Sequence, residues 1–221
     1  PNVDMNGDGK TDFVVTRAID NALTSVGRGL LPRVNLGARS LRERRALEKQ
    51  QSAMQSPQSA SIAWYTSING TNVFSAAQWG DPVTDFLTPA DYDGDGKTDI
   101  AVWRQGPGGT AAFYILQSAT NTFRGDVFGK TGDDPSVVGD YDGDGKADLG
   151  LYRPSTGTWM VLLSSTNYEA SIAHQWGLGT DVPAAADYDG DGKTDLAVYR
   201  PSSGIWYILL SSSDYTTFIS R

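Results

Sequence analysis

Short apolar runs alternate with polar, glycine-rich loops along most of the chain. Four of these runs are rich in β-branched and aromatic residues, and each ends at an arginine after a few positions. Runs of this length and composition are typical of strands and are too short for helices. They are FVVTR, IAVWR, LGLYR and LAVYR, which end at Arg17, Arg104, Arg153 and Arg200.

Each apolar run directly follows a nine-residue acidic loop. The loops read DMNGDGKTD, DYDGDGKTD, DYDGDGKAD and DYDGDGKTD, and they begin at Asp4, Asp91, Asp140 and Asp187. Oxygen-bearing side chains stand at positions one, three, five and nine, and glycines at positions four and six allow sharp turns. Because alternate residues of a tight loop can point the same way, we expect these oxygens to converge on a cation.

Calcium fits this donor set, because it accepts about six to eight oxygen ligands in a tolerant geometry, whereas magnesium requires a rigid octahedron. We expect about four Ca²⁺ ions, one per loop, with the lysine at position seven contributing its backbone carbonyl. The predicted ligands are Asp4, Asn6, Asp8, Lys10, Asp12, Asp91, Asp93, Asp95, Lys97, Asp99, Asp140, Asp142, Asp144, Lys146, Asp148, Asp187, Asp189, Asp191, Lys193 and Asp195.

Two other interpretations of the loops are weaker. Solvated turns also favour Asp and Gly, but four copies in one register would place repelling carboxylates together without a cation. An EF-hand needs a glutamate at position twelve and flanking helices. Position twelve is apolar in every copy, as Val15, Val102, Leu151 and Val198.

The spacing of the loops predicts a repeat. The last three loops begin 49 and 47 residues apart, a period typical of propeller blades. Each unit reads as a strand, the loop, a second strand ending in arginine, a third strand, and a fourth strand ending in QWG or VFG. The predicted fold is a single all-β domain over 1–221, a β-propeller of four-stranded antiparallel blades. Its four blades would span about 1–80, 81–129, 130–177 and 178–221.

Aromatic residues recur at matched places in these strands, and we expect them to pack between neighbouring blades. They are Trp64, Phe113, Trp159 and Trp206 in the third strands and Trp79, Phe128 and Trp176 in the fourth. The arginine after each second strand is expected to pair with a nearby carboxylate.

Residues 18–60 interrupt the first blade and differ in composition, with seven basic and three acidic residues. Ser40 and Glu43 form a capping-box pattern, which predicts a helix at about 40–54. The segment is interpreted as a solvated insertion on the first blade, or alternatively as a docking element for a neighbouring subunit or an acidic surface.

The run DYDGDGKTDLAVYRPSSGIWYI resembles the FG-GAP/VCBS repeat family, whose calcium-loop blades also form integrin α-subunit propellers and some fungal lectins. The resemblance covers most of the chain and implies a propeller with calcium in the hairpin between the first two strands of each blade. It carries the ligand roles onto the residues named above. Integrin propellers have seven blades, so the four here leave open a four-bladed ring, half of a larger ring, or a trimmed piece of a longer protein.

The amino-acid composition limits the kinds of partner that this chain could bind. The net charge is −8, and the loops contribute 15 carboxylates, three in the first and four in each of the others. Four calcium ions would neutralise this charge, and nucleic acid is disfavoured because phosphate binding requires basic residues. The chain has no cysteine, and it contains neither a signal peptide nor an apolar run of membrane-spanning length. Calcium modules of low affinity work where calcium is plentiful, so we expect a secreted bacterial protein, extracellular or at the cell surface.

We predict a non-catalytic scaffold for interaction or adhesion, binding a protein or glycan at the cell surface. The single histidine, His174, lies in a predicted strand without a nucleophile motif, and the aspartates are assigned to metal, so no enzyme is expected. Two alternatives remain open: a carbohydrate-binding lectin, suggested by the repeated aromatic residues, and a structural subunit of a surface fibre or layer. The second would assemble through blade edges or through the basic insertion.

Overall fold

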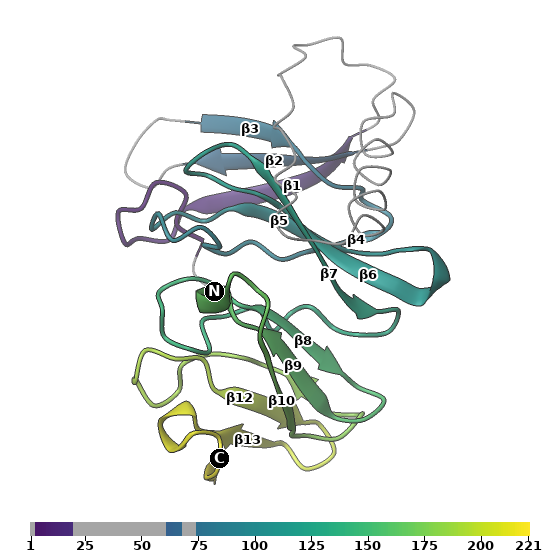
Figure 1. The fold of residues 1–221 in the computed structure, drawn as a ribbon, viewed down its shortest axis with the longest axis vertical. Helices are drawn as coiled ribbons and strands as arrows, with labels where there is room; N and C mark the ends of the chain where they lie inside the picture. The colour runs from purple at the N-terminus through teal and green to yellow at the C-terminus, as the bar shows by residue number, and fades with distance from the viewer. Residues whose placement is uncertain (1–2, 20–60, 68–73) are drawn as a thin grey trace. The chain divides into compact units, whose positions relative to one another are not determined.

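The computed structural model describes residues 3–19, 61–67 and 74–221, which form four antiparallel β-sheets (Figure 1). The strand orders are β1-β2-β3, β4-β5-β6-β7, β10-β9-β8 and β11-β12-β13-β14, so strands that are consecutive in the chain are neighbours in each sheet. The described residues are therefore all-β, as predicted, in sheets of the kind that make propeller blades. The predicted helix at 40–54 and most of the insertion lie outside the described residues.

The strand bounds follow the apolar runs of the sequence. The first two sheets contain β1 (Phe13–Ile19), β2 (Ser61–Ser67), β3 (Phe74–Gln78), β4 (Asp85–Leu87), β5 (Ile100–Gln105), β6 (Thr110–Leu116) and β7 (Phe123–Lys130). The last two contain β8 (Leu149–Arg153), β9 (Thr158–Leu162), β10 (Ser171–Gln175), β11 (Val182–Pro183), β12 (Leu196–Arg200), β13 (Ile205–Leu209) and β14 (Phe218–Ser220). Short 3-10 turns follow β9 and β13, at η3 (Ser164–Thr166) and η4 (Ser211–Ser213).

Only two of the four sheets have the predicted four strands. In the third sheet the segment predicted as a first strand, 135–140, makes one isolated bridge, Gly139 with Asp148, and a second bridge, Asp134 with Tyr152, lies just before it. Pro135, which has no N–H to donate to a ladder, lies in this segment, although the short strand β11 of the fourth sheet tolerates Pro183. The first sheet has three strands within the described residues.

The chain divides into two compact units, each with its own core. The N-terminal unit comprises Asn2–Pro89 and Asp95–Phe128, and the C-terminal unit comprises Ala90–Gly94 and Gly129–Arg221, together with Pro1. Within the described residues, the N-terminal unit holds the first two sheets and the C-terminal unit the last two.

Aromatic residues fill both cores. Trp64 and Trp79 are buried with Tyr114 in the N-terminal unit, and Trp159 is buried with Tyr152 in the C-terminal unit. The buried indoles are also hydrogen-bonded, since Trp64 Nε1 donates to the Trp79 carbonyl at 2.8 Å. The predicted packing role is confirmed for these residues, whereas Trp206 in β13 is 38% exposed.

Three of the four arginines that end the second strands form the expected ion pairs. Arg153 pairs with Asp133 through two hydrogen bonds of 2.7 and 2.8 Å, and Arg200 pairs with Asp181 at 2.9 and 2.8 Å. Arg104 pairs with Asp85 in the same two-bond manner. The carboxylates are buried, and each pair ties the second strand to the chain just before the acidic loop.

Candidate metal centres

The backbone of each acidic loop turns around the side chain of its first aspartate. In the third loop Asp140 Oδ1 accepts from the Gly143 N–H at 2.6 Å, and Oδ2 accepts from the Gly145 N–H at 2.8 Å. Both glycines have positive φ, +81° and +84°, which L-residues with a Cβ rarely adopt. Asp187 makes the same two bonds in the fourth loop, at 2.6 and 3.0 Å.

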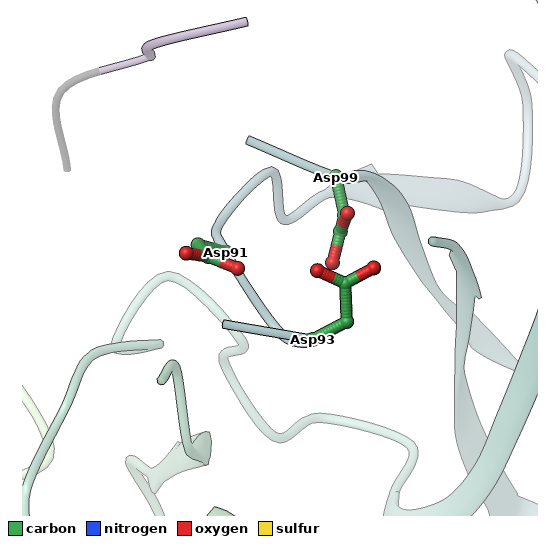
Figure 2. A group of neighbouring side chains, drawn as sticks. All are labelled: Asp91, Asp93 and Asp99. Carbon is green, nitrogen blue, oxygen red and sulfur yellow. The ribbon is translucent and has the colours of Figure 1, made fainter. Parts of the chain in front are cut away.

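Carboxylates at positions one, three and nine come together in three of the four loops. In each group one ligand oxygen from every residue lies within 4.8 Å of the other two, so each group can hold a metal ion. Figure 2 shows the second loop, where the three side chains surround a common space. The groups are Asp91, Asp93 and Asp99; Asp140, Asp142 and Asp148; and Asp187, Asp189 and Asp195.

The aspartate at position nine is buried, and its hydrogen bonds connect the start of its own loop to the end of the third strand. Asp148 Oδ2 accepts from the Tyr141 N–H at 2.8 Å, and its Oδ1 accepts from the Ser164 N–H at 2.6 Å. Asp195 repeats both bonds with Tyr188 and Ser211, at 2.8 and 2.7 Å. This residue therefore fixes the loop in place as well as contributing to the carboxylate group.

The predicted ligands at position five lie outside the three groups. Asp144 Oδ1 accepts from the Lys146 N–H at 2.8 Å and from the Ser164 hydroxyl at 2.9 Å. Asp191 Oδ1 accepts in the same way from Lys193 and Ser211, at 2.8 and 3.0 Å. The position-five carboxylates close the loops through these bonds, and their role as ligands, like that of the lysine carbonyls, stays a prediction.

Serines that follow the third strand contact the carboxylates, and the loop pattern alone did not identify them. Ser165 Oγ donates to Asp142 Oδ2 at 2.6 Å, and Ser212 Oγ donates to Asp189 Oδ2. The signal was present in the sequence, because the pair Ser-Ser follows Leu-Leu at the end of both strands. Since η3 and η4 carry these pairs, the third strand of each sheet helps to orient the adjacent acidic loop.

The first loop is different. Asn6 replaces aspartate at position three, and the carboxylates of Asp4, Asp8 and Asp12 do not form such a group among the described residues. Its backbone is nevertheless shaped like the others, since Asp4 accepts from the Gly7 and Gly9 N–H groups at 2.8 and 2.7 Å. The amide oxygen of Asn6 remains a neutral donor for a cation.

The pKa shifts of the aspartates differ between the third and fourth loops. Burial, reinforced by the negative charge of Asp142, raises the pKa of Asp148 to about 6 and also raises the pKa of Asp140. In the fourth loop, hydrogen bonds from Gly190 and Gly192 lower the pKa of Asp187. A divalent cation among the carboxylates of the third loop would offset their mutual repulsion.

The chemical type of the donor atoms indicates which class of metal ion fits these sites. Every grouped ligand is a carboxylate oxygen, a hard donor that suits Ca²⁺, Mg²⁺ or Mn²⁺ and not thiolate-seeking or imidazole-seeking metals. The three centres therefore fit a hard divalent cation.

Comparison with known protein families agrees with the loop geometry. A family model described as an FG-GAP-like repeat matches residues 91–151 and 140–198. Residues 91–198 belong to the FG-GAP-like repeat family. Each matched FG-GAP-like segment begins at the first aspartate of one loop and ends at position twelve of the next, so it includes the strands that lie between two loops. Comparisons with curated proteins and with solved structures gave no match.

His174 lies in β10 opposite Trp159, and its ring centroid is 4.9 Å from that of Tyr215. This packing supports the structural role predicted for the residue. None of the helical segments in the described ranges has the length and apolar character of a membrane span.

Proposed function

We propose that this chain is an extracellular, calcium-stabilised β-propeller module that acts as a non-catalytic scaffold for interaction or adhesion. One observation carries the proposal: the same three loop positions bring carboxylate oxygens within 4.8 Å of one another in three loops, all within residues 91–198, which match the FG-GAP-like repeat. A repeated geometry of this kind is better explained by a repeated ligand than by the general tendency of Asp and Gly to form turns.

Calcium is favoured over magnesium because the loops offer many oxygens at variable distances. Around the three carboxylates, the position-five side chain, the position-seven carbonyl and water would complete a shell of about six to eight ligands. Magnesium retains several waters and is usually held by one or two carboxylates. The expected set is therefore one Ca²⁺ in each loop, with the weakest site in the first loop, where Asn6 contributes no charge.

The ion would stabilise the fold and would not take part in a reaction. Each acidic loop joins the first strand of a repeat to the second, and its buried aspartate at position nine is bonded to the end of the third strand. An ion held at positions one, three and nine would therefore lock three parts of one sheet together. Binding then adds to folding stability by about 2.7 kcal/mol per site at a hundredfold excess of free calcium over Kd.

The lectin alternative stays a second proposal, and the burial of several repeated aromatic residues makes it the weaker of the two. It rested on the repeated aromatic residues, but Trp64, Phe113 and Trp159 are buried in the described cores. Buried rings pack sheets together and are unavailable for stacking on a sugar. We therefore favour a protein ligand over a glycan.

Calcium dependence is tested by thermal unfolding of the whole chain in about 10 mM calcium, in the same concentration of magnesium, and in chelator. We expect chelation to lower Tm by about 10 °C or more, because each occupied site contributes separately, and magnesium to restore only part of the loss. Equilibrium dialysis should find three to four calcium ions per chain. Asp189→Asn should remove or weaken one site, and Asp214→Asn, an equal change of charge at an exposed turn, should leave all sites intact.

A Tm unchanged by chelator, together with no bound calcium in dialysis, would reject the metal role. The scaffold role is tested separately by binding of the calcium-loaded chain to arrays of extracellular proteins and of glycans. Binding to proteins that is lost in chelator is the expected result. Silence on both arrays would contradict a scaffold function while leaving the calcium sites in place.

A further inference from the structure

Neighbouring sheets pack through a repeated set of residue pairs. In the C-terminal unit, Tyr152 on β8 is the cross-strand partner of Trp159 on β9, with ring centroids 5.4 Å apart. These two buried residues share a core cluster with Val198 and Tyr207, which are cross-strand partners on β12 and β13. A Tyr–Trp pair on one sheet is thus covered by a Val–Tyr pair on the next.

The N-terminal unit uses the same arrangement. Trp64 on β2, paired with Thr16 on β1, lies in one cluster with Val102 and Tyr114, which are partners on β5 and β6. A tryptophan-bearing pair is again covered by a Val–Tyr pair from the sheet that follows in sequence. We call the face with the tryptophan-bearing pair the trailing face of a sheet and the opposite face the leading face. The leading face carries a Val–Tyr pair in the first, second and fourth sheets and Leu151–Met160 in the third.

Among the described residues, the trailing face of the fourth sheet and the leading face of the first carry exposed members of these pairs. On the fourth sheet, Tyr199 and Trp206 are cross-strand partners with ring centroids 5.3 Å apart, and Trp206 is 38% exposed. Their counterparts in the third sheet, Tyr152 and Trp159, are 0% and 1% exposed.

The exposed leading face belongs to the first sheet. Val15 and Tyr65 are cross-strand partners on β1 and β2, and they are 63% and 44% exposed. Their counterparts on the second sheet, Val102 and Tyr114, are both fully buried. Neighbouring exposed apolar side chains can mark a site of protein interaction.

The residue types on the two exposed faces indicate which partner would cover them. Tyr199–Trp206 repeats the Tyr–Trp pair of the third sheet, and Val15–Tyr65 repeats the Val–Tyr pair that covers it. The surface complementary to the exposed Tyr–Trp pair is therefore present, also exposed, on every copy of this chain.

We propose that the trailing face at Tyr199 and Trp206 of one copy packs against the leading face at Val15 and Tyr65 of a second copy. The contact is heterologous, because the two surfaces differ, so each dimer retains one free face of each kind and can add further copies. Such head-to-tail contacts close into rings or extend into filaments. The inference does not depend on metal binding, and its failure would leave the calcium sites unaffected.

The first test measures mass in solution. Sedimentation velocity or light scattering of the calcium-loaded chain, over a range from about 1 μM to about 1 mM, should show a weight-average mass that rises with concentration. Trp206→Glu and Tyr65→Lys should each return the mass to that of a monomer. Val83→Glu introduces the same charge as Trp206→Glu at an exposed apolar residue outside both faces, and it should associate like the unmodified chain.

A mixing experiment then distinguishes this contact from other modes of association. Trp206→Glu retains an intact leading face and Tyr65→Lys retains an intact trailing face. An equimolar mixture should therefore form a 1:1 dimer that grows no further. This result also shows that both variants are folded, because each contributes a working surface.

Three outcomes would overturn the proposal. The first is a chain that is monomeric at every concentration. The second is a Tyr65→Lys variant that still dimerises by itself, since it could do so only through a contact other than the proposed one. The third is a mixture that remains monomeric while circular dichroism shows that both variants are folded.

Discussion

Single side chains outside the acidic loops can orient the carboxylates of a loop. Ser211 illustrates this, because its N–H and its hydroxyl both donate to Asp195 Oδ1, at 2.7 and 2.8 Å, and the hydroxyl also lies 3.0 Å from Asp191 Oδ1. A serine that contacts no metal would therefore orient two carboxylates of the proposed calcium site. Such supporting residues usually matter almost as much as the ligands themselves.

Ser211→Ala should weaken calcium binding at the fourth loop by about 10- to 100-fold, the usual range for loss of a residue that supports a ligand. The physical reason is that the carboxylates at positions five and nine lose the hydroxyl that fixes their orientation. Calcium titration by calorimetry should show one weakened site. Ser202→Ala, in an exposed turn, is the matched control, and equal affinities in the two variants would contradict the proposed orientation.

Asp181 predicts a dependence of stability on pH that is separate from metal binding. Hydrogen bonds from the Arg200 guanidinium, supported by the Leu178 N–H, lower the pKa of Asp181 from its ordinary value of 3.8. A depressed pKa means that the ion pair stabilises the fold fully above the pKa of the unfolded chain. This stabilisation is lost as the pH falls below about 3.8, through the lower pKa of the folded state.

Replacing this carboxylate should remove that part of the acid sensitivity. Asp181→Asn should lower the free energy of unfolding by about 2 kcal/mol at neutral pH, since hydrogen bonds to a charged group are lost. The difference between the unmodified chain and the variant should shrink below pH 3.8. Urea unfolding at several pH values measures it, and a difference that is constant with pH would show that the charge of Asp181 is not responsible.

At the level of elements, neighbouring acidic loops of the C-terminal unit are hydrogen-bonded to each other. The Thr194 N–H of the fourth loop donates to the Asp140 carbonyl of the third at 2.6 Å. The Tyr215 hydroxyl lies 2.8 Å from the Thr194 carbonyl and 3.4 Å from the Tyr141 carbonyl. Glycine is favoured at position four of the third loop, because Gly143 has a φ of +81° and a Cβ there would also lie 3.0 Å from Lys193 Cε.

Tyr215→Phe removes a hydroxyl at this junction and leaves the ring in place. We expect a loss of about 1 kcal/mol in the free energy of unfolding, because a buried carbonyl loses its partner. If the ions bind where we propose, calcium binding at the third and fourth loops should also become less cooperative. An unchanged free energy of unfolding for Tyr215→Phe would show that this junction does not stabilise the fold.

The elements differ in how far the sequence could predict them. The strands that follow the loops were predictable, because β-branched and aromatic runs such as LAVYR leave few alternatives to a strand. The spacing predicted that the side chains at positions one, three and nine come together, but it also included position five and the first loop, which lie outside the three groups. The absence of a regular strand at 135–140 could not be predicted from local patterns, because the effect of Pro135 depends on its position in the ladder. The serine contacts required the third strand to end beside the loop, which is a tertiary fact that local patterns do not contain.

Across the whole molecule, the acidic loops dominate the charge. Fifteen of the 26 acidic residues lie in the four loops, against a net charge of −8. Concentrated like charge destabilises a compact state through repulsion. Bound divalent cations and dissolved salt both reduce that repulsion, the first by direct coordination and the second by screening.

Calcium binding and added salt should therefore each reduce the stabilising effect of the other. In chelator, raising sodium chloride from about 0.05 to about 0.5 M should increase Tm by several degrees, because the Debye length falls from about 14 to about 4 Å. With calcium present at saturating concentration, the same change in salt should move Tm much less, since the loop charges are already neutralised. Thermal unfolding in sodium chloride with and without chelator measures both slopes. Equal slopes in the two conditions would mean that repulsion among the loop carboxylates does not limit the stability of the metal-free chain.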